Sequence, residues 1–160
     1  MQGKPYAGNP HVRFDEGAGA PRHSGRSALL YKEMTLEERM DYAARRKSEM
    51  NCCQAVLVAF ADRLGKDEAE LLRLGSGFGA GMGTMEGTCG ALVGAIMVSS
   101  LVSPDGAAIK NSRAIMPRFK ELCGGATICR ELKGIDTGKV LCSCENCVRN
   151  AVRAAGEVFA

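Results

Sequence analysis

The sequence predicts an all-α fold, a compact bundle of several helices with a central buried helix rich in glycine and alanine and a glycine-rich loop. Several segments carry apolar residues at helical spacing, each opened by a residue that can cap a helix. No stretch alternates apolar and polar residues for long enough to form a strand. Hydrophobic and charged contents of 46% and 24% are typical of one globular domain. We interpret residues 1–26, which mix glycine, proline and charge, as a disordered tail and residues 27–160 as a single helical, cysteine-rich domain.

The first half of this domain carries three expected helices with local start signals. Residues 35–38 form the capping box Thr-Leu-Glu-Glu, which opens a helix through about residue 46. Asn51 can cap a second helix that stops at Gly65, and Asp67 can cap a short third one.

The next expected helix is the most apolar segment of the chain. Residues 87–104 are 18 residues without a charge, which is the length at which a membrane span must be considered. With Thr88 as its cap and a start near Cys89, the helix has about 14 residues and a length of about 21 Å, whereas the hydrocarbon layer is about 30 Å thick. A helix buried at the centre of a soluble bundle fits better, and no membrane association is expected.

The second half of the domain is helical with clear interruptions. Residues 107–122 have a helical period, but Pro117 is expected to kink or split the helix. Two glycines at residues 124–125 break the chain again. The last helix begins at Ser143 or Cys144 and runs to about residue 158.

Composition and charge exclude several classes of function. A net charge of +3 is too small to indicate a nucleic-acid partner. Both histidines, His11 and His23, lie in the expected tail. The domain therefore lacks the histidine that Cys–His nucleophiles, mixed cysteine–histidine zinc sites and histidine-mediated acid–base catalysis require. The eight cysteines, with no recognisable secretory segment, predict a cytoplasmic protein whose grouped thiols bind metal or carry out redox chemistry.

Four cysteines lie in the first turns of four different expected helices. Each follows a residue able to cap its helix: Cys52 follows Asn51, Cys89 follows Thr88, Cys129 lies two residues after Thr127, and Cys144 follows Ser143. A helix N-terminus offers unpaired N–H groups and a partial positive charge, which lower the pKa of a thiol. Gathered at one point, the four thiols form a site for a metal, an iron–sulfur cluster or a reactive dithiol; the alternative is that each is a small buried apolar residue.

The other cysteines are less clearly placed. Cys142 and Cys147 flank Cys144 in a CxC that overlaps a CxxC, a pattern typical of redox thiols and of one arm of a metal site. Cys53 lies about 100° around a helix from Cys52, so only one of the two is expected to face the site. Cys123 is interpreted as a core residue or as a partner of Cys129.

A glycine-rich loop and one arginine complete the candidate residues. Residues 75–83 alternate five glycines, but no strand precedes them and the Lys-Ser/Thr of a phosphate-binding loop is absent, so nucleotide binding is disfavoured. The loop is expected instead to pass close to another backbone or to wrap a cluster. Arg130 is expected to pair locally, the alternative being that it compensates thiolate charge.

Five short motifs follow one another between residues 51 and 148. They are Asn51-Cys52-x-Gln54-Ala55-Val56, Gly77-Phe78-Gly79-x-Gly81-Met82-Gly83, Cys89-Gly90-Ala91-x-x-Gly94-Ala95, Cys129-Arg130-Glu131-Leu132 and Cys144-x-x-x-Val148. Together they resemble the C-GCAxxG-C-C family of cysteine-rich proteins to which redox activity is ascribed, over about residues 35–158. The family is named for four cysteines, and by motif these map to the four at the expected helix starts.

The resemblance implies a soluble helical protein with redox activity. Cys142 and Cys147 are additional to the family pattern, so either is a possible substitute for Cys144 as the fourth ligand. The chain is also distantly similar to the helical part of split-Soret cytochromes, which are associated with an iron–sulfur centre. The CxxCH motif that attaches haem is absent, so no haem is expected.

The cysteines support three hypotheses. The first is electron transfer or redox sensing through a [2Fe–2S] or [4Fe–4S] cluster held by Cys52, Cys89, Cys129 and Cys144. The second is a thiol–disulfide oxidoreductase that uses Cys144 and Cys147. The third is a structural zinc protein whose ion is held by four cysteines. A redox partner protein is expected, and the sequence leaves the oligomeric state open, a homodimer included.

Overall fold

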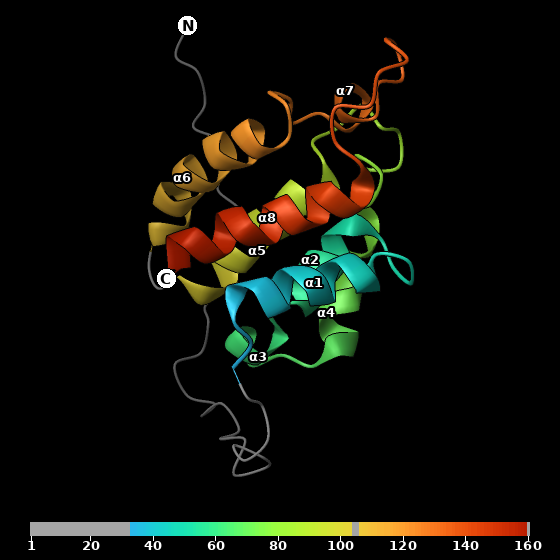
Figure 1. The fold of residues 1–160 in the computed structure, drawn as a ribbon. Helices are drawn as coiled ribbons and strands as arrows, with labels where there is room; N and C mark the ends of the chain where they lie inside the picture. The colour runs from blue at the N-terminus through green and yellow to red at the C-terminus, as the bar shows by residue number, and fades with distance from the viewer. Residues whose placement is uncertain (1–32, 104–105, 160) are drawn as a thin grey trace, which may run out of the picture. The chain divides into compact units, whose positions relative to one another are not determined.

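The computed structural model describes residues 33–103 and 106–159, and within these residues the chain is helical with no strand (Figure 1). The elements are α1 (Leu36–Arg46), α2 (Cys52–Val58), α3 (Ala61–Leu64), α4 (Glu68–Gly75), the 3-10 turn η1 (Ser76–Phe78), α5 (Gly90–Val102), α6 (Ala107–Leu122), α7 (Cys129–Leu132) and α8 (Cys144–Phe159). The predicted all-α class is confirmed. The expected tail, residues 1–26, lies outside the described residues.

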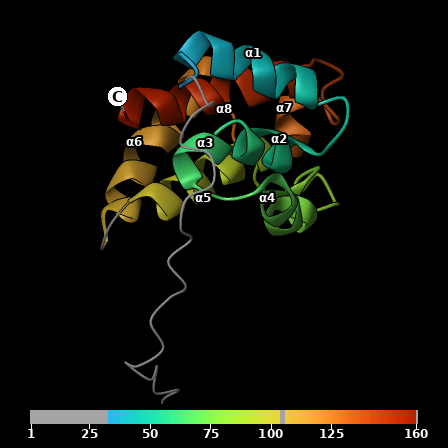
Figure 2. The ribbon, with the colours of Figure 1, turned by 90° about the horizontal axis from the view of Figure 1, so that it is seen from below.

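Helix α5 is the central element of the bundle. It packs against α2, α6 and α8, and it lies behind α8 in Figure 1 and beneath it in Figure 2. Its small residues bring α2 close, because a Cβ at Gly94 would lie only 2.8 Å from the carbonyl oxygen of Cys53. Among the described residues, no helix has both the length and the apolar character required to cross a bilayer.

Helix α1 is held on the bundle by a buried arginine. Arg39 is 2% exposed, donates to the carbonyl of Ala59 and pairs with both carboxylate oxygens of Asp62 at 2.6 and 2.8 Å. Since Arg39 occupies the Ala59 carbonyl, the N–H of Arg63 bonds instead to Phe60, at 3.0 Å. The expected single helix from Asn51 to Gly65 is therefore wrong, and the chain forms α2 and α3 with a break between them.

The sequence identified most helix starts correctly. Thr35 and Asn51 both form capping boxes, Asp67 accepts from the N–H of Glu70 at 2.7 Å, and Ser143 accepts from the N–H of Asn146 at 3.2 Å. Each of these caps involves residues within three positions of each other, which is why the sequence alone reveals them.

Two expected caps, Thr88 and Thr127, are wrong. Cys89 and Ile128 take the N-cap positions of α5 and α7, and neither makes a side-chain capping bond. Thr88 instead pairs with Ile128 in an isolated antiparallel bridge, and the carbonyl of Thr127 accepts from the N–H of Cys89. A contact between distant segments has replaced the local cap.

Helix α6 continues through Pro117 and is not split there. Pro117 and Arg113, the residue four positions before it, are both exposed. The carbonyl that loses its N–H partner therefore lies on the solvent side of the helix, where water can satisfy it.

Candidate functional site

The bridge between Thr88 and Ile128 places two cysteines side by side. The N–H of Cys89 donates to the carbonyl of Thr127 at 2.8 Å, and the N–H of Cys129 donates to the carbonyl of Gly87 at 3.0 Å. Cys89 is the N-cap of α5 and Cys129 is the first residue of α7. The two helices therefore start next to each other, although 40 residues separate the two cysteines in the chain.

Cys52, the first residue of α2, is brought to the same point by a glycine. A Cβ on Gly90 would lie 2.8 Å from the Cys52 sulfur and would also clash with the carbonyl of Phe78. Only a residue without a side chain allows α2, α5 and the end of η1 to meet this closely. The glycine of the Cys-Gly-Ala motif is thus a packing requirement at the cysteine site.

A cavity of about 150 Å³ lies where these helices start. It is lined by Lys47, Asn51, Cys52, Ala80, Met85, Cys89, Cys129, Lys133, Cys144 and Cys147. All four cysteines selected from the sequence line it, together with Cys147, one of the two possible substitutes. The other substitute, Cys142, does not line it, nor does Cys53, which contacts the sulfur of Met97 at 3.7 Å.

The five thiols differ in their access to solvent. Cys89, Cys129 and Cys52 are 2, 3 and 6% exposed, and Cys147 is fully buried. Cys144 is exposed. The cavity therefore has a buried thiol wall with one thiol at its mouth.

Lys133 is the cation that the sequence analysis missed. Its ammonium group donates to the carbonyl of Cys142 at 2.7 Å and lies 3.5 Å from the sulfur of Cys147. It also contacts Cys144. A lysine four residues after Cys129 lies on the same face of a helix, which is the signal that could have identified it. Arg130, in contrast, pairs locally with Asp136, at 2.6 and 2.8 Å.

The pKa values of the deepest thiols are raised. For Cys89 the largest cause is its hydrogen bond with Cys147, followed by burial, and the N–H groups of Ala91 and Leu92 at the start of α5 oppose the shift without overcoming it. Burial raises the pKa of Cys129 to about 11. The expectation that helix N-termini lower these two pKa values is therefore wrong. Both thiols keep their protons at neutral pH unless a metal displaces them.

The glycine-rich loop passes close to another part of the backbone, which is one of the two roles that its composition predicts. Residues 80–83 all have left-handed backbone, with φ of 47, 56, 56 and 80°, and two of them are not glycine. A Cβ on Gly81 would lie 2.7 Å from the Cβ of Cys129 and 2.9 Å from the carbonyl of Gly87. The tight left-handed turn is what lets the loop press against α7, and it brings Ala80 into the cavity wall.

A second group of thiols adjoins the cavity. The sulfur atoms of Cys123, Cys142 and Cys147 all lie within 4.8 Å of one another, and all three residues are buried. Cys147 belongs to both groups. Cys123 lies beside Cys142, because α6 ends and α8 begins at this place, and it does not line the cavity with Cys129.

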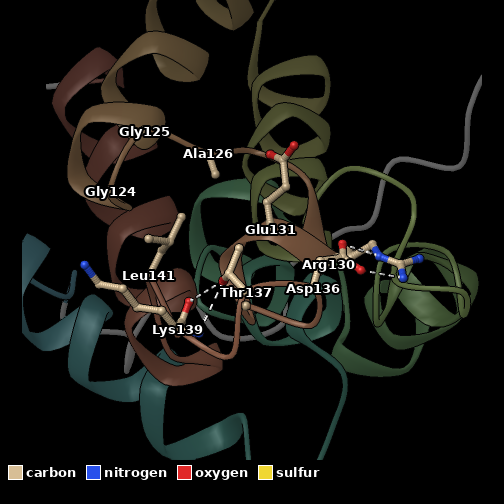
Figure 3. Close-up of a pocket in the computed structure, with 10 residues that line it drawn as sticks. Gly124, Gly125, Ala126, Arg130, Glu131, Asp136, Thr137, Lys139 and Leu141 are labelled. Atoms are coloured by element: carbon tan, nitrogen blue, oxygen red, sulfur yellow. Dashed lines mark hydrogen bonds and ion pairs between the residues drawn. The ribbon is translucent and has the colours of Figure 1, made fainter.

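A larger cavity, of about 370 Å³, lies beside α7 but contains no thiol (Figure 3). Some of its charged and polar groups are engaged with one another. Arg130 pairs with Asp136, and the hydroxyl of Thr137 accepts from the N–H of Lys139 at 3.2 Å. The cysteine-lined cavity is therefore the stronger candidate for chemistry.

The comparisons with known proteins agree with the cysteine pattern. The family model described as "Putative redox-active protein (C_GCAxxG_C_C)" matches residues 50–158, which is more than half of the chain. No curated protein and no solved structure matches the chain.

Proposed function

Because the chain belongs to the C_GCAxxG_C_C family, we propose that it transfers electrons or senses redox state through an iron–sulfur cluster bound in the cysteine-lined cavity. The observation that carries this proposal is that thiols from the starts of α2, α5, α7 and α8 line one cavity. The proposed ligands are the four family cysteines: Cys52, Cys89, Cys129 and Cys144.

The donor chemistry fits such a cluster. Thiolates are the usual ligands of iron–sulfur clusters, and the cavity lining contains neither a carboxylate nor an imidazole. Lys47 and Lys133 supply positive charge that offsets the charge of thiolates. When bound, a cluster supplies one-electron redox chemistry, while the buried wall limits its contact with water.

The spacing of the thiols favours a cluster over a single ion. Among the described residues, the three sulfurs within 4.8 Å of one another are those of Cys123, Cys142 and Cys147, and the four family cysteines are not so close. A zinc ion needs four sulfurs at about 2.3 Å from one centre, whereas a cluster distributes its thiolates over separate irons. The wider arrangement therefore supports the cluster.

Anaerobic reconstitution of the full chain with ferrous iron and sulfide tests the proposal. We expect a brown chromophore that bleaches on reduction, with iron and sulfide in stoichiometric amounts. Cys89→Ser should remove the chromophore because it removes a buried ligand. Cys53→Ser and Cys123→Ser should retain it, since neither residue lines the cavity. Full colour in Cys89→Ser would contradict the ligand assignment.

A second candidate, thiol–disulfide exchange at Cys144 and Cys147, is favoured by one contact. Lys133 touches both thiols, and its positive charge opposes the rise in the pKa of Cys147 that the hydrogen bond with Cys123 and burial cause. Colourless protein whose Cys144 and Cys147 are oxidised and reduced together would support this candidate over the cluster. Colourless protein with stoichiometric zinc would instead support the structural site.

A further inference from the structure

Cys123 and Cys142 stand apart from the proposed cluster ligands and contact each other. Cys123 follows the last residue of α6, Cys142 lies in the loop before α8, and their sulfur atoms are 3.5 Å apart. Neither lines the cysteine-lined cavity. We propose that these two residues form a reversible disulfide, a two-electron redox centre that is separate from the cavity.

The geometry allows this bond with little movement. The two sulfurs are already in van der Waals contact, and to form the bond they must approach from 3.5 Å to about 2.05 Å. The backbone at each residue is held, since the N–H of Cys123 donates to Phe119 at 3.0 Å and the N–H of Cys142 donates to Leu132 at 3.2 Å. The fold thus presents the pair to each other before any oxidation occurs.

Asn150 supplies a hydrogen-bond donor to both sulfurs. Its side-chain nitrogen lies 3.4 Å from the sulfur of Cys123 and 3.8 Å from that of Cys142. The same nitrogen donates to the carbonyl of Leu122 at 3.0 Å, which only the NH2 end of the amide can do. A donor aimed at both sulfurs stabilises whichever of them is the thiolate during exchange.

The surroundings favour a disulfide over a metal ion. Cys147 is the third sulfur within 4.8 Å, but no fourth cysteine, histidine or carboxylate of the described chain completes the group. The ammonium group of Lys133 lies 3.5 Å from the Cys147 sulfur, and the amide of Asn150 reaches the other two. These N–H groups lie on sides of the sulfurs from which a tetrahedrally coordinated zinc ion would have to bind.

A small disulfide such as oxidised glutathione can oxidise the pair in two thiol–disulfide exchange steps. Cys142, 6% exposed against 1% for Cys123, attacks one glutathione sulfur and releases the other as glutathione thiolate. Cys123 then attacks the Cys142 sulfur of the mixed disulfide and releases the second glutathione thiolate. Two thiols lose two electrons, glutathione disulfide gains them, and the two thiol protons pass to the released thiolates.

The bond would close the segment that carries α7. It joins residues 19 apart and so ties the end of α6 to the loop that precedes α8. A cross-link of this length limits the freedom of the unfolded chain, so the oxidised protein should melt several degrees above the reduced protein. This effect does not require a cluster in the cavity.

The test uses the full chain, reduced and treated with a chelator, then equilibrated anaerobically across a series of glutathione to glutathione-disulfide ratios. After alkylation and trypsin digestion, we expect a cross-link between peptides 121–130 and 140–149 that appears over one narrow range of ratios with the loss of two thiols. Because each peptide contains more than one cysteine, variants identify the pair. Cys123→Ser and Cys142→Ser should abolish the cross-link, and the controls Cys129→Ser and Cys144→Ser should retain it.

Other outcomes would overturn the proposal. These are thiols that stay reduced at every ratio, a cross-link that survives Cys123→Ser or Cys142→Ser, or stoichiometric zinc that either substitution removes. If a serine variant fails to fold, the melting temperatures of the oxidised and reduced natural chain still test the proposal. Equal melting temperatures would contradict the formation of the disulfide. A failure to reconstitute the cluster leaves this test untouched, because it uses metal-free protein.

Discussion

At the scale of single residues, the glycines of the cysteine motifs are explained by how closely α5 packs against its neighbours. Gly90 and Gly94 lie one turn apart on α5, and a Cβ on either would clash with α2 or with the end of η1. Their spacing of four residues places both on the same face of the helix. The glycines therefore set the distance at which the cysteine-bearing helices meet.

Gly94→Ala tests this packing without altering a thiol. The new methyl group would lie 2.8 Å from the carbonyl oxygen of Cys53 and 3.0 Å from the Cβ of Val56, so α2 and α5 must separate. We expect the free energy of unfolding, measured by urea denaturation, to fall by about 1–3 kcal/mol. The control Gly77→Ala should stay near the natural chain, because nothing lies within 4 Å of its added methyl group.

At the scale of elements, the start of α2 is tied to the first two residues of the glycine-rich loop. Asn51 accepts from the N–H of Gln54 at 3.0 Å, and its NH2 group donates to the carbonyls of Gly75 and Ser76 at 3.0 and 3.1 Å. One side chain thus caps the helix that carries Cys52 and anchors the segment that leads into the cavity wall. The other capping box, at Thr35, only starts α1.

Asn51→Ala and Thr35→Ala form a matched pair for this dual role. Each removes a cap, so each should lower the free energy of unfolding by about 0.5–2 kcal/mol. Only Asn51→Ala also frees the chain at Gly75, and it should shorten the lifetime of the reconstituted chromophore in air severalfold. Equal chromophore lifetimes in the two variants would show that the anchoring of the loop does not protect the site.

At the scale of the whole bundle, the elements that carry the thiols converge at one end. The starts of α7 and α8 and the glycine-rich loop lie together at the right of Figure 1. Arg39 and Asp62, which hold α1 against α2 and α3, do not line the cavity. The bundle thus separates the groups that stabilise α1 from those that line the site.

The ion pair of Arg39 and Asp62 predicts the response of the bundle to acid. Burial acts to raise the pKa of Asp62, but hydrogen bonds from Arg39 outweigh it and lower the pKa below its ordinary value. The pair therefore stabilises the fold above about pH 4, and this stability is lost as the pH falls through the lowered pKa. Unfolding free energy measured from pH 7 down to pH 2 should show this decline.

Asp62→Asn should flatten the part of the decline that comes from this pair. At pH 7 it should also lower the free energy of unfolding by about 3–5 kcal/mol, because it leaves the buried charge of Arg39 uncompensated. Asp136→Asn, which breaks the exposed pair with Arg130, should leave stability at neutral pH nearly unchanged. An Asp62→Asn variant as stable as the natural chain would show that the pair contributes little.

Much of the fold and the choice of cysteines could be predicted from the sequence. The all-α class and the caps at Thr35, Asn51, Asp67 and Ser143 depend on residues a few positions apart, so local chemistry determines them. The caps at Asn51 and Ser143 correctly placed Cys52 and Cys144 at helix starts, whereas Cys89 and Cys129 were placed there from the family motifs and from two caps that the structure does not form. Their role as ligands stays a prediction.

Only the tertiary structure decided which distant groups meet. The bridge of Thr88 with Ile128 displaced two local caps, Arg39 took the Ala59 carbonyl and divided a helix, and Cys123 came into contact with Cys142. The direction of the pKa shifts at Cys89 and Cys129 was also decided there, because it depends on burial and neighbouring groups more than on the helix end. Helix caps and cysteine spacing are local properties of a chain, whereas burial and contacts across the bundle exist only after the helices have packed.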